Sequence, residues 1–177
     1  MNSQTGIFMK LYLYSLIMFL VLSCTKPVPQ LPSNKGNTAD TVSGSLLKIN
    51  EKLTVYEDSL ITELVKIKYA DFTKSNLGFW YKTEKSSTKS LLKSNDKCTV
   101  NYSLSTLNGK KLIQKKTTIT IGKKEIITGI EECLKLISKG DKATVIIPWY
   151  LAYGLNGNNS EIEPYTSVIA ELFVSEQ

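Results

Sequence analysis

Histidine and arginine are both absent from this chain of 177 residues. Without histidine, the chain lacks the commonest general base, the usual activator of serine and cysteine nucleophiles, and the commonest zinc ligand. All 22 basic residues are therefore lysine, and the formal net charge is +6. Because arginine is preferred for bidentate contacts to phosphate and guanine, we interpret the positive balance as a solvated lysine surface and expect no nucleic-acid partner.

Cysteine is scarce, occurring only at Cys24, Cys98 and Cys133. Three thiols without histidine match no zinc motif, so neither a metal nor a cofactor is expected. Cys98 lies among apolar neighbours in a strand-like segment, which predicts a buried, unreactive thiol. A Cys98–Cys133 disulfide is the alternative in an exported protein.

The one long apolar run lies near the N-terminus. It follows Lys10 and covers about 12 residues, whereas a helix across a bilayer needs about 20. The run ends at Val21-Leu22-Ser23-Cys24, which resembles a bacterial lipobox with Cys24 as the lipid-accepting residue. This pattern predicts a lipoprotein signal peptide over residues 1–23, membrane attachment through lipid on Cys24, and a place in the cell envelope facing the periplasm. An ordinary secretory signal with a chance cysteine is the alternative.

Two segments precede the C-terminal domain. Residues 24–45 are rich in proline, glycine and polar residues, which predicts a disordered tether. Residues 46–76 are expected to be helical, with a helix over 46–69 and a break near Asp58-Ser59 as an alternative. Its apolar residues recur in steps of three and four, at Leu46, Ile49, Leu53, Tyr56, Leu60, Leu64 and Ile67. This stripe is expected either to pack on the following domain or to form a homodimer through the 46–69 helix.

Residues 77–177 are expected to form one α+β domain. Their pattern predicts about five antiparallel strands, at 78–85, 97–104, 111–121, 142–147 and 166–174. Leu107-Asn108-Gly109-Lys110 predicts a type I′ hairpin turn. A short amphipathic helix is expected between the third and fourth strands, so that the sheet wraps on this helix. The carboxylates of Glu131, Glu132 and Glu161 are expected on solvated faces, which disfavours acid–base chemistry.

Three pieces of sequence follow one another in this domain. They are Glu125-Ile126-Ile127-x-Gly129-Ile130-Glu131-Glu132, then Gly140-Asp141-Lys142-Ala143, then Pro148-x-x-x-Ala152-Tyr153-Gly154 with Ile162-x-Pro164 beyond. Together they resemble the signature of FKBP-type peptidyl-prolyl isomerases, over about residues 78–174. The resemblance implies an FKBP-like antiparallel five-stranded sheet on a short helix. It also implies peptidyl-prolyl cis-trans isomerase activity on proline-containing polypeptides.

The resemblance assigns the site residues as well. The pocket floor and walls are expected from Tyr102, Leu112, Ile126, Ile127, Ile130 and Ile162. Tyr153 is expected to lean over the pocket and donate its hydroxyl, and Ile127 to offer its backbone N–H to the substrate carbonyl. These two are the expected catalytic residues. For the aliphatic members, plain core packing is the alternative.

Several pocket positions depart from the family pattern. Ile130 stands where the family usually has tryptophan, Leu112-Ile113 replaces a Phe-Asp pair, and Ala170 replaces a second aromatic residue. These changes imply a more open pocket and reduced activity. They motivate an alternative, a non-catalytic FKBP-like binding or chaperone module with a degenerate site.

The arrangement of the whole chain resembles a narrower group. A lipobox, a tether and a helix before Gly78-Phe79-Trp80-Tyr81 resemble the gliding-motility-associated FKBP-type lipoproteins. This resemblance implies a lipid-anchored helper that assists the folding of envelope or exported proteins, including those that serve surface motility.

Overall fold

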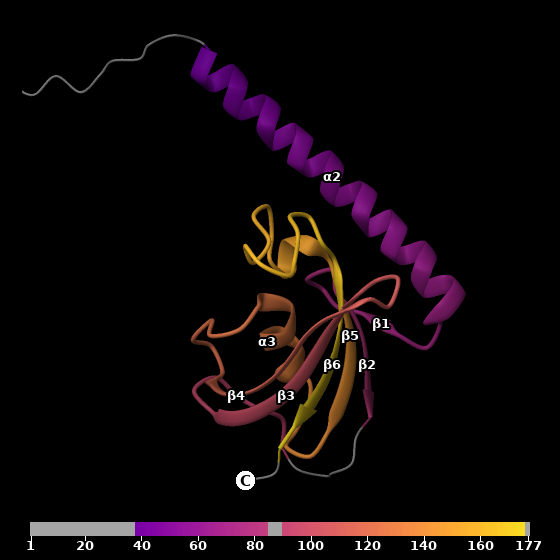
Figure 1. Cartoon of the computed structure of the whole chain (residues 1–177), viewed down its shortest axis with the longest axis vertical. Coiled ribbons are helices and arrows are strands. Elements are labelled where there is room, and N and C mark those ends of the chain that lie inside the picture. Colours follow the sequence, from indigo (N-terminus) through magenta and orange to yellow (C-terminus); the bar gives the residue numbers. More distant parts are fainter. Residues whose placement is uncertain (1–37, 85–89, 176–177) are drawn as a thin grey trace, which may run out of the picture. The chain divides into compact units, whose positions relative to one another are not determined.

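The structure is a computed structural model that describes residues 38–84 and 90–175 (Figure 1). The signal peptide, Cys24 and the first part of the expected tether lie outside the described residues. The chain divides into two compact units between Ser43 and Gly44. The account below concerns the second unit, together with the helix that enters it.

Helix α2 spans Thr38–Lys68. It begins at Thr38 rather than at Leu46, so the last residues assigned to the tether are helical. The alternative of a break near Asp58-Ser59 is wrong: the helix is continuous there, and the Ser59 hydroxyl donates to the Val55 carbonyl instead of capping a new helix. Among the described residues, no helix is long and apolar enough to cross a membrane.

Six antiparallel strands form one sheet in the described part of the chain. They are β1 (Thr73–Lys74), β2 (Trp80–Glu84), β3 (Lys97–Thr106), β4 (Lys111–Thr120), β5 (Lys142–Ile147) and β6 (Val168–Val174). Their order across the sheet is β1-β2-β5-β6-β3-β4. The two-residue β1 is additional to the five expected strands. The α+β class and the sheet on a short helix are confirmed (Figure 1).

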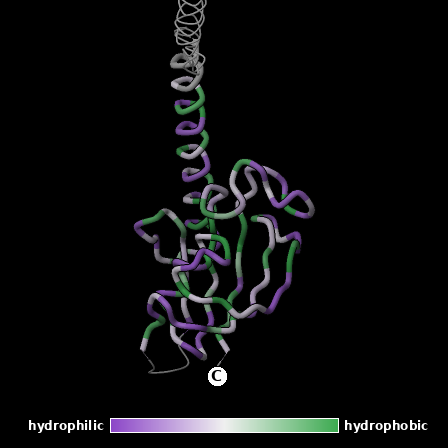
Figure 2. The backbone as a smooth tube through the Cα atoms, turned by 90° about the vertical axis from the view of Figure 1, so that its left-hand side faces the viewer, coloured by the Kyte–Doolittle hydropathy of each residue, from purple (hydrophilic) through white to green (hydrophobic). Residues whose placement is uncertain are grey.

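The main core lies between the sheet and the short helix α3 (Thr128–Leu134). Along β3, Val100, Tyr102 and Leu104 are buried in this core, whereas the alternate residues are more exposed, as the period of a strand requires. Helix α3 approaches β5 closely at Gly129, where an added Cβ would overlap the Ile147 side chain. Figure 2 colours the backbone by hydropathy and shows hydrophobic stretches, in green, running through the domain.

Both cysteines of the domain are buried within this core. Cys98 and Cys133 are free thiols, so the alternative of a disulfide between them is wrong. Burial raises the pKa of the Cys98 thiol and raises the pKa of Cys133 to about 12. Because the thiolate is the reactive form, the expected inert character of Cys98 follows from its packing.

The β3–β4 hairpin closes through a three-residue loop. The Gly109 N–H donates to the Thr106 carbonyl at 2.9 Å, and Gly109 has a φ of 89°. Asn108 is not among the described non-glycine residues with positive φ, which a type I′ turn requires. The expected type I′ turn is therefore wrong. A type I turn followed by a left-handed glycine fits the same Asn-Gly pair.

A second, smaller core joins α2 to the opposite face of the sheet. Ile61 and Val65 of α2 pack against Ile146 of β5 and Ile169 of β6. The stripe at Leu46, Ile49, Leu53, Tyr56 and Leu60 is not part of this contact, and all five side chains are exposed. Helix α2 therefore packs on the domain through Ile61 and Val65, and not through the apolar stripe that its sequence periodicity predicted.

Candidate functional site

A pocket of about 280 Å³ opens at the side of the main core. It is lined by Tyr102, Lys115, Thr117, Lys124, Glu125, Ile126, Ile127 and Tyr153. Four of the seven expected site residues therefore meet here: Tyr102, Ile126, Ile127 and Tyr153. Tyr102 comes from β3, the two isoleucines precede α3, and Tyr153 comes from the turn after β5.

The other three expected residues do not line this pocket. Ile130 is 0% exposed and Ile162 is 2% exposed, and both lie inside the main core. Leu112, on β4, is half-buried and packs against the same core. These three residues therefore pack in or against the core, which was the alternative considered for the aliphatic residues in the sequence analysis.

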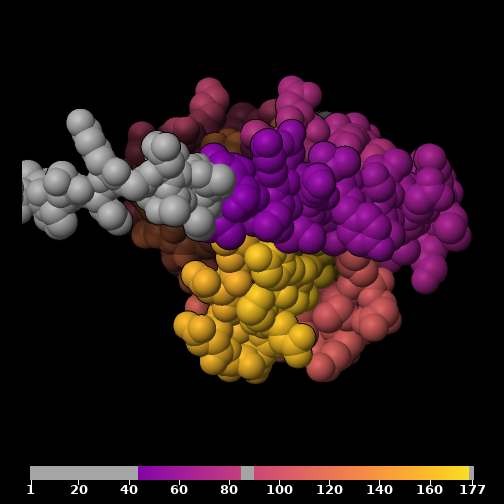
Figure 3. Space-filling view, turned by 90° about the horizontal axis from the view of Figure 1, so that it is seen from above, coloured from indigo at the N-terminus to yellow at the C-terminus, as the bar shows by residue number. Residues whose placement is uncertain are grey.

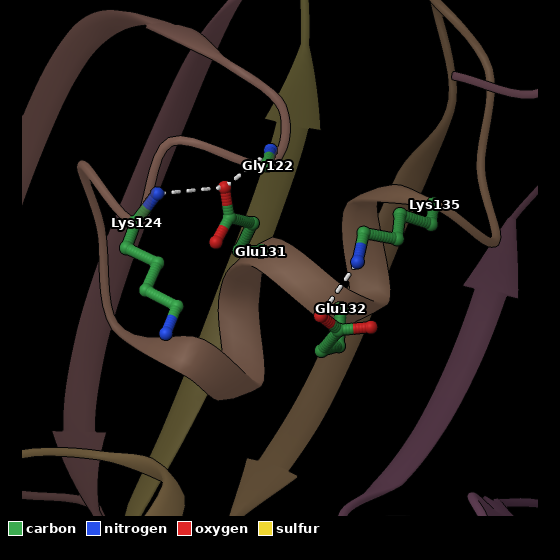
Figure 4. Close-up of polar contacts among 5 residues, drawn as sticks. All are labelled: Gly122, Lys124, Glu131, Glu132 and Lys135. Carbon is green, nitrogen blue, oxygen red and sulfur yellow. Dashed lines mark hydrogen bonds and ion pairs between the residues drawn. The ribbon is translucent and has the colours of Figure 1, made fainter. Parts of the chain in front are cut away.

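A buried carboxylate shapes the loop that carries Ile126 and Ile127. Glu131 is 4% exposed, and its Oε1 accepts the backbone N–H groups of Gly122 at 2.7 Å and Lys124 at 3.2 Å (Figure 4). The expectation that Glu131 lies on a solvated face is therefore wrong. Glu125 also stabilises this segment, because its Oε2 accepts a hydrogen bond from the Thr120 N–H at 2.7 Å. These contacts fix the position of the segment between β4 and α3, and residues of this segment form one wall of the pocket.

The turn that carries Tyr153 is also held by backbone bonds. Helix η1 (Trp149–Leu151) follows Pro148, and the Trp149 carbonyl accepts the Gly154 N–H at 2.9 Å. Further along, the Asn158 Oδ1 accepts the N–H groups of Ser160, Glu161 and Ile162. The Tyr153 side chain therefore extends from a turn with its own internal hydrogen bonds.

Two phenols and one backbone amide stand out among the polar groups of the pocket. Burial raises the pKa of the Tyr102 hydroxyl and of the Tyr153 hydroxyl, so both stay neutral donors at ordinary pH. Within the described residues, neither hydroxyl has a hydrogen-bond partner, and the Ile127 N–H donates to none, although its carbonyl accepts from Ile130 and Glu131. Three donors are thus available to a ligand's carbonyl groups.

The pocket contains no constellation for bond-breaking chemistry. Among the described residues, no group of His, Cys, Asp and Glu could hold a metal ion. The one pocket carboxylate, Glu125, already accepts the Thr120 N–H. The arrangement can bind an apolar chain segment and hydrogen-bond its carbonyls, and it suits a conformational reaction.

The sequence analysis missed Lys115, Thr117, Lys124 and Glu125 as lining residues. The β3–β4 register places Lys115 directly opposite Tyr102 and Thr117 opposite Val100. Side chains directly opposite in an antiparallel pair share a face, so a register derived from the hairpin would have found the two β4 residues. Lys124 and Glu125 had no comparable signal, because the bonds to Glu131 decide where their loop lies.

A larger hollow, of about 470 Å³, also touches Tyr102 and Lys115. Its remaining lining comes mainly from the strand faces and includes Asn101, Ser103 and Phe173. Tyr153 and the isoleucines 126 and 127 do not line it. We therefore place the candidate site in the smaller pocket, where the residues of the sequence motif converge.

Comparison with known proteins identifies a family that part of this chain resembles. Residues 88–173 match the sequence profile of the family described as FKBP-type peptidyl-prolyl cis-trans isomerase. Residues 88–173 are therefore similar to an FKBP-type domain. This match supports, for that part of the chain, the expectation of an FKBP-type peptidyl-prolyl isomerase domain drawn from the motif between Glu125 and Pro164.

Two individual proteins resemble parts of the chain. Over 55 residues it is 40% identical to FK506-binding protein 3 from Dictyostelium discoideum, an alignment that covers 31% of this chain and only 28% of that relative. The structure also aligns with the crystal structure of FkpA from Escherichia coli, with a TM-score of 0.56, 19% identity, and coverage of 83% of this chain and 73% of that one. The second likeness shows a shared fold.

Proposed function

We propose that this protein catalyses cis-trans isomerisation of X-Pro bonds in polypeptides, through its FKBP-type domain. The observation that carries the proposal is the convergence of Tyr102, Ile126, Ile127 and Tyr153 on one pocket. These residues supply apolar walls and neutral donors, but no nucleophile. That combination is suited to a substrate that must rotate about a bond rather than break one.

The physical basis of this catalysis is the polarity of the planar amide. Rotation about the C–N bond has a barrier of about 18–20 kcal/mol, because twisting removes the resonance that gives the bond double-bond character. The planar form is more polar than the twisted one, so an apolar pocket favours the twisted state relative to it. A hydrogen bond from the Ile127 N–H or the Tyr153 hydroxyl would hold the neighbouring chain during rotation.

The direct test is an isomerase assay on X-Pro peptides. The purified chain should accelerate exchange that otherwise takes tens to hundreds of seconds, and Tyr153→Ala should reduce the acceleration. NMR exchange spectroscopy or a protease-coupled assay would measure it. No acceleration across a panel of residues before proline would contradict the catalytic proposal.

The burial of Ile130 and Ile162 favours a second candidate. With both residues in the core rather than on the pocket wall, less apolar surface is available to a bound proline. A non-catalytic binding or chaperone module would use the same pocket. It would suppress aggregation of a proline-free client while leaving X-Pro exchange at its background rate, and the two assays together separate the candidates.

We propose further that the protein is anchored in the cell envelope through lipid on Cys24, and assists envelope or exported proteins, including those of gliding motility. The support is the Val21-Leu22-Ser23-Cys24 pattern behind a short apolar run. Wild-type chain should carry lipid label and sediment with membranes, and Cys24→Ala should do neither. Membrane sedimentation and labelling that survive the substitution would contradict the anchor.

We also propose that α2 mediates a homodimer. The support is the exposed stripe at Leu46, Ile49, Leu53, Tyr56 and Leu60, whose alternating steps of three and four are those of a two-stranded coiled coil. Ile49→Asp with Leu53→Asp should halve the mass measured by light scattering. A wild-type chain that is monomeric at tens of micromolar would contradict the dimer; Lys48→Asp with Lys52→Asp is the matched control.

A further inference from the structure

The positive charge of this protein is concentrated in one hairpin. Residues 97–124, which comprise β3, β4 and the loop that follows, contain seven of the lysines and neither aspartate nor glutamate. All seven are exposed: Lys97, Lys110, Lys111, Lys115, Lys116, Lys123 and Lys124. Since the whole chain has a net charge of only +6, the rest of the molecule is close to neutral. We call these residues the lysine hairpin.

None of the lysines of this hairpin forms an ion pair within the described structure, although Glu84 and Glu171 line the same hollow as Lys115 and Lys116. Lysines that do form ion pairs in the described part of the chain include Lys66, Lys82 and Lys135, all outside the hairpin. β4 is also the last strand of the sheet, so its outer edge has no partner strand among the described residues. A lysine-rich edge resists pairing with an apolar strand, but it attracts an extended chain that carries negative charge.

The hairpin and the pocket are one continuous surface. Lys115 and Lys124 line the pocket beside Tyr102 and Tyr153. The acidic groups around the site are few: Glu125 is in the lining, and Glu161 acts electrostatically on Tyr153. Lysine therefore predominates on the β4 side of the pocket, and Glu161 lies with the Tyr153 turn.

We infer that the lysine hairpin binds acidic segments of client polypeptides. Binding there would bring a neighbouring X-Pro bond close to the candidate pocket. This inference rests on the proposed isomerase or binding function of that pocket. Clustered charge of one sign raises the local concentration of oppositely charged ligands and accelerates their association. The effect is screened over about 8 Å at physiological salt, so it acts on residues flanking the proline rather than on distant ones.

The experiment compares peptides that share one X-Pro core. The core is flanked by two glutamates, two lysines or two serines, and kcat/KM for isomerisation by the full chain is measured at low and high salt. At low salt the acidic peptide should exceed the basic one by about tenfold. At high salt the rates should converge, because the charges are screened.

Two triple variants locate the effect. Lys110→Gln, Lys111→Gln and Lys116→Gln remove charge from the hairpin without touching the pocket lining. Lys48→Gln, Lys52→Gln and Lys68→Gln remove the same charge from exposed positions of α2. The hairpin variant should lose most of the acidic preference and keep the wild-type rate on the serine peptide, whereas the α2 variant should keep the preference.

Three outcomes would overturn the inference. They are equal rates on acidic and basic peptides, a preference that survives in the hairpin variant, and an equal loss in both variants. If no peptide is isomerised, the catalytic proposal fails instead, and fluorescence anisotropy of the same peptides still tests the acidic preference. Hairpin-dependent sedimentation with phosphatidylglycerol vesicles, without any peptide preference, would assign the surface to lipid and reject a polypeptide partner.

Discussion

The Tyr153 hydroxyl is the group of the candidate site that allows the most specific prediction. It lies in the pocket without a partner among the described residues, and burial keeps it neutral. Tyr153→Phe should cost the net value of one hydrogen bond, about 0.5–1.5 kcal/mol, and therefore reduce peptide binding or kcat/KM severalfold. Tyr153→Ala should reduce them further because it also removes apolar wall.

Stability measurements provide the control for Tyr153. Both variants should unfold at nearly the wild-type denaturant concentration, since the side chain is only half-buried at the pocket. If Tyr153→Ala unfolded the domain while Tyr153→Phe bound peptide normally, Tyr153 would be a core aromatic rather than a ligand contact.

Glu131 supports the pocket from behind. Its carboxylate accepts two backbone N–H groups, of Gly122 and Lys124. Glu131→Ala would leave both N–H groups without this acceptor, and hydrogen bonds to charged groups contribute about 1.5–3 kcal/mol each. We expect a clear loss of unfolding free energy in urea, and a smaller loss for Glu131→Gln, whose amide oxygen can still accept.

Glu132 offers the matched control for Glu131. It lies one position further along α3 and pairs with Lys135 at 2.6 Å, at a partly exposed site (Figure 4). Because such ion pairs contribute little, Glu132→Ala should change stability by less than Glu131→Ala. Equal effects of the two substitutions would show that Glu131 does not brace the loop.

At the scale of elements, two side-chain hydrogen bonds, which we call the latch, join α2 to Tyr150, in the turn after β5, and to Ser167. The Tyr150 hydroxyl of η1 donates to Asp58 Oδ1 at 2.7 Å, and the Ser167 hydroxyl donates to the Glu57 carboxylate. Figure 3 shows the purple helix lying against the orange and yellow residues of this region. The same turn continues into Tyr153, so the latch joins the helix to the element that bears the candidate catalytic residue.

Removing the Tyr150 hydroxyl tests this latch. Tyr150→Phe should lower the unfolding free energy by about 1 kcal/mol and should increase hydrogen exchange in the second half of α2. Ser59→Ala, which removes an exposed hydroxyl bonded only within the helix, should leave both measurements near wild type. Unchanged exchange in Tyr150→Phe would mean that the apolar contacts of Ile61 and Val65 hold the helix alone.

At the scale of the whole molecule, three phenols, one buried and two half-buried, are expected to lower stability at alkaline pH. Burial raises the pKa values of Tyr102, Tyr150 and Tyr153 above that of a free tyrosine, and Asp58 adds to the shift at Tyr150. A group whose pKa is raised on folding contributes its full stability below its unfolded-state pKa and loses it as the pH rises further. Unfolding free energy should therefore fall above about pH 10.

Unfolding in urea between about pH 8 and about pH 11 measures this limit. Tyr150→Phe should make the alkaline decline shallower, because one of the three shifted groups is gone. A decline of the same steepness in both proteins would show that the Tyr150 phenol does not contribute to it.

The fold class, the resemblance to the family and half of the residues that line the candidate pocket could be predicted from the amino-acid sequence. Alternation along Lys97–Thr106 requires a half-buried strand, and the spacing from Glu125 to Pro164 carries the family signature. Tyr102, Ile126, Ile127 and Tyr153 could be named because they belong to these local patterns. Local patterns could not set the turn type at Asn108-Gly109, since one dipeptide suits two loops that differ by a residue.

Which apolar residues line the pocket and which fill the core could not be predicted from local sequence, because it depends on how distant segments pack. Ile126 and Ile130 have the same chemistry and lie four residues apart, yet one lines the pocket and the other is fully buried under the sheet. Strand register, not composition, brings Lys115 opposite Tyr102. The periodicity of α2 predicts an apolar stripe, but it does not show which face of the helix is buried. That face is set by contacts with β5 and β6, which lie far from α2 in the sequence.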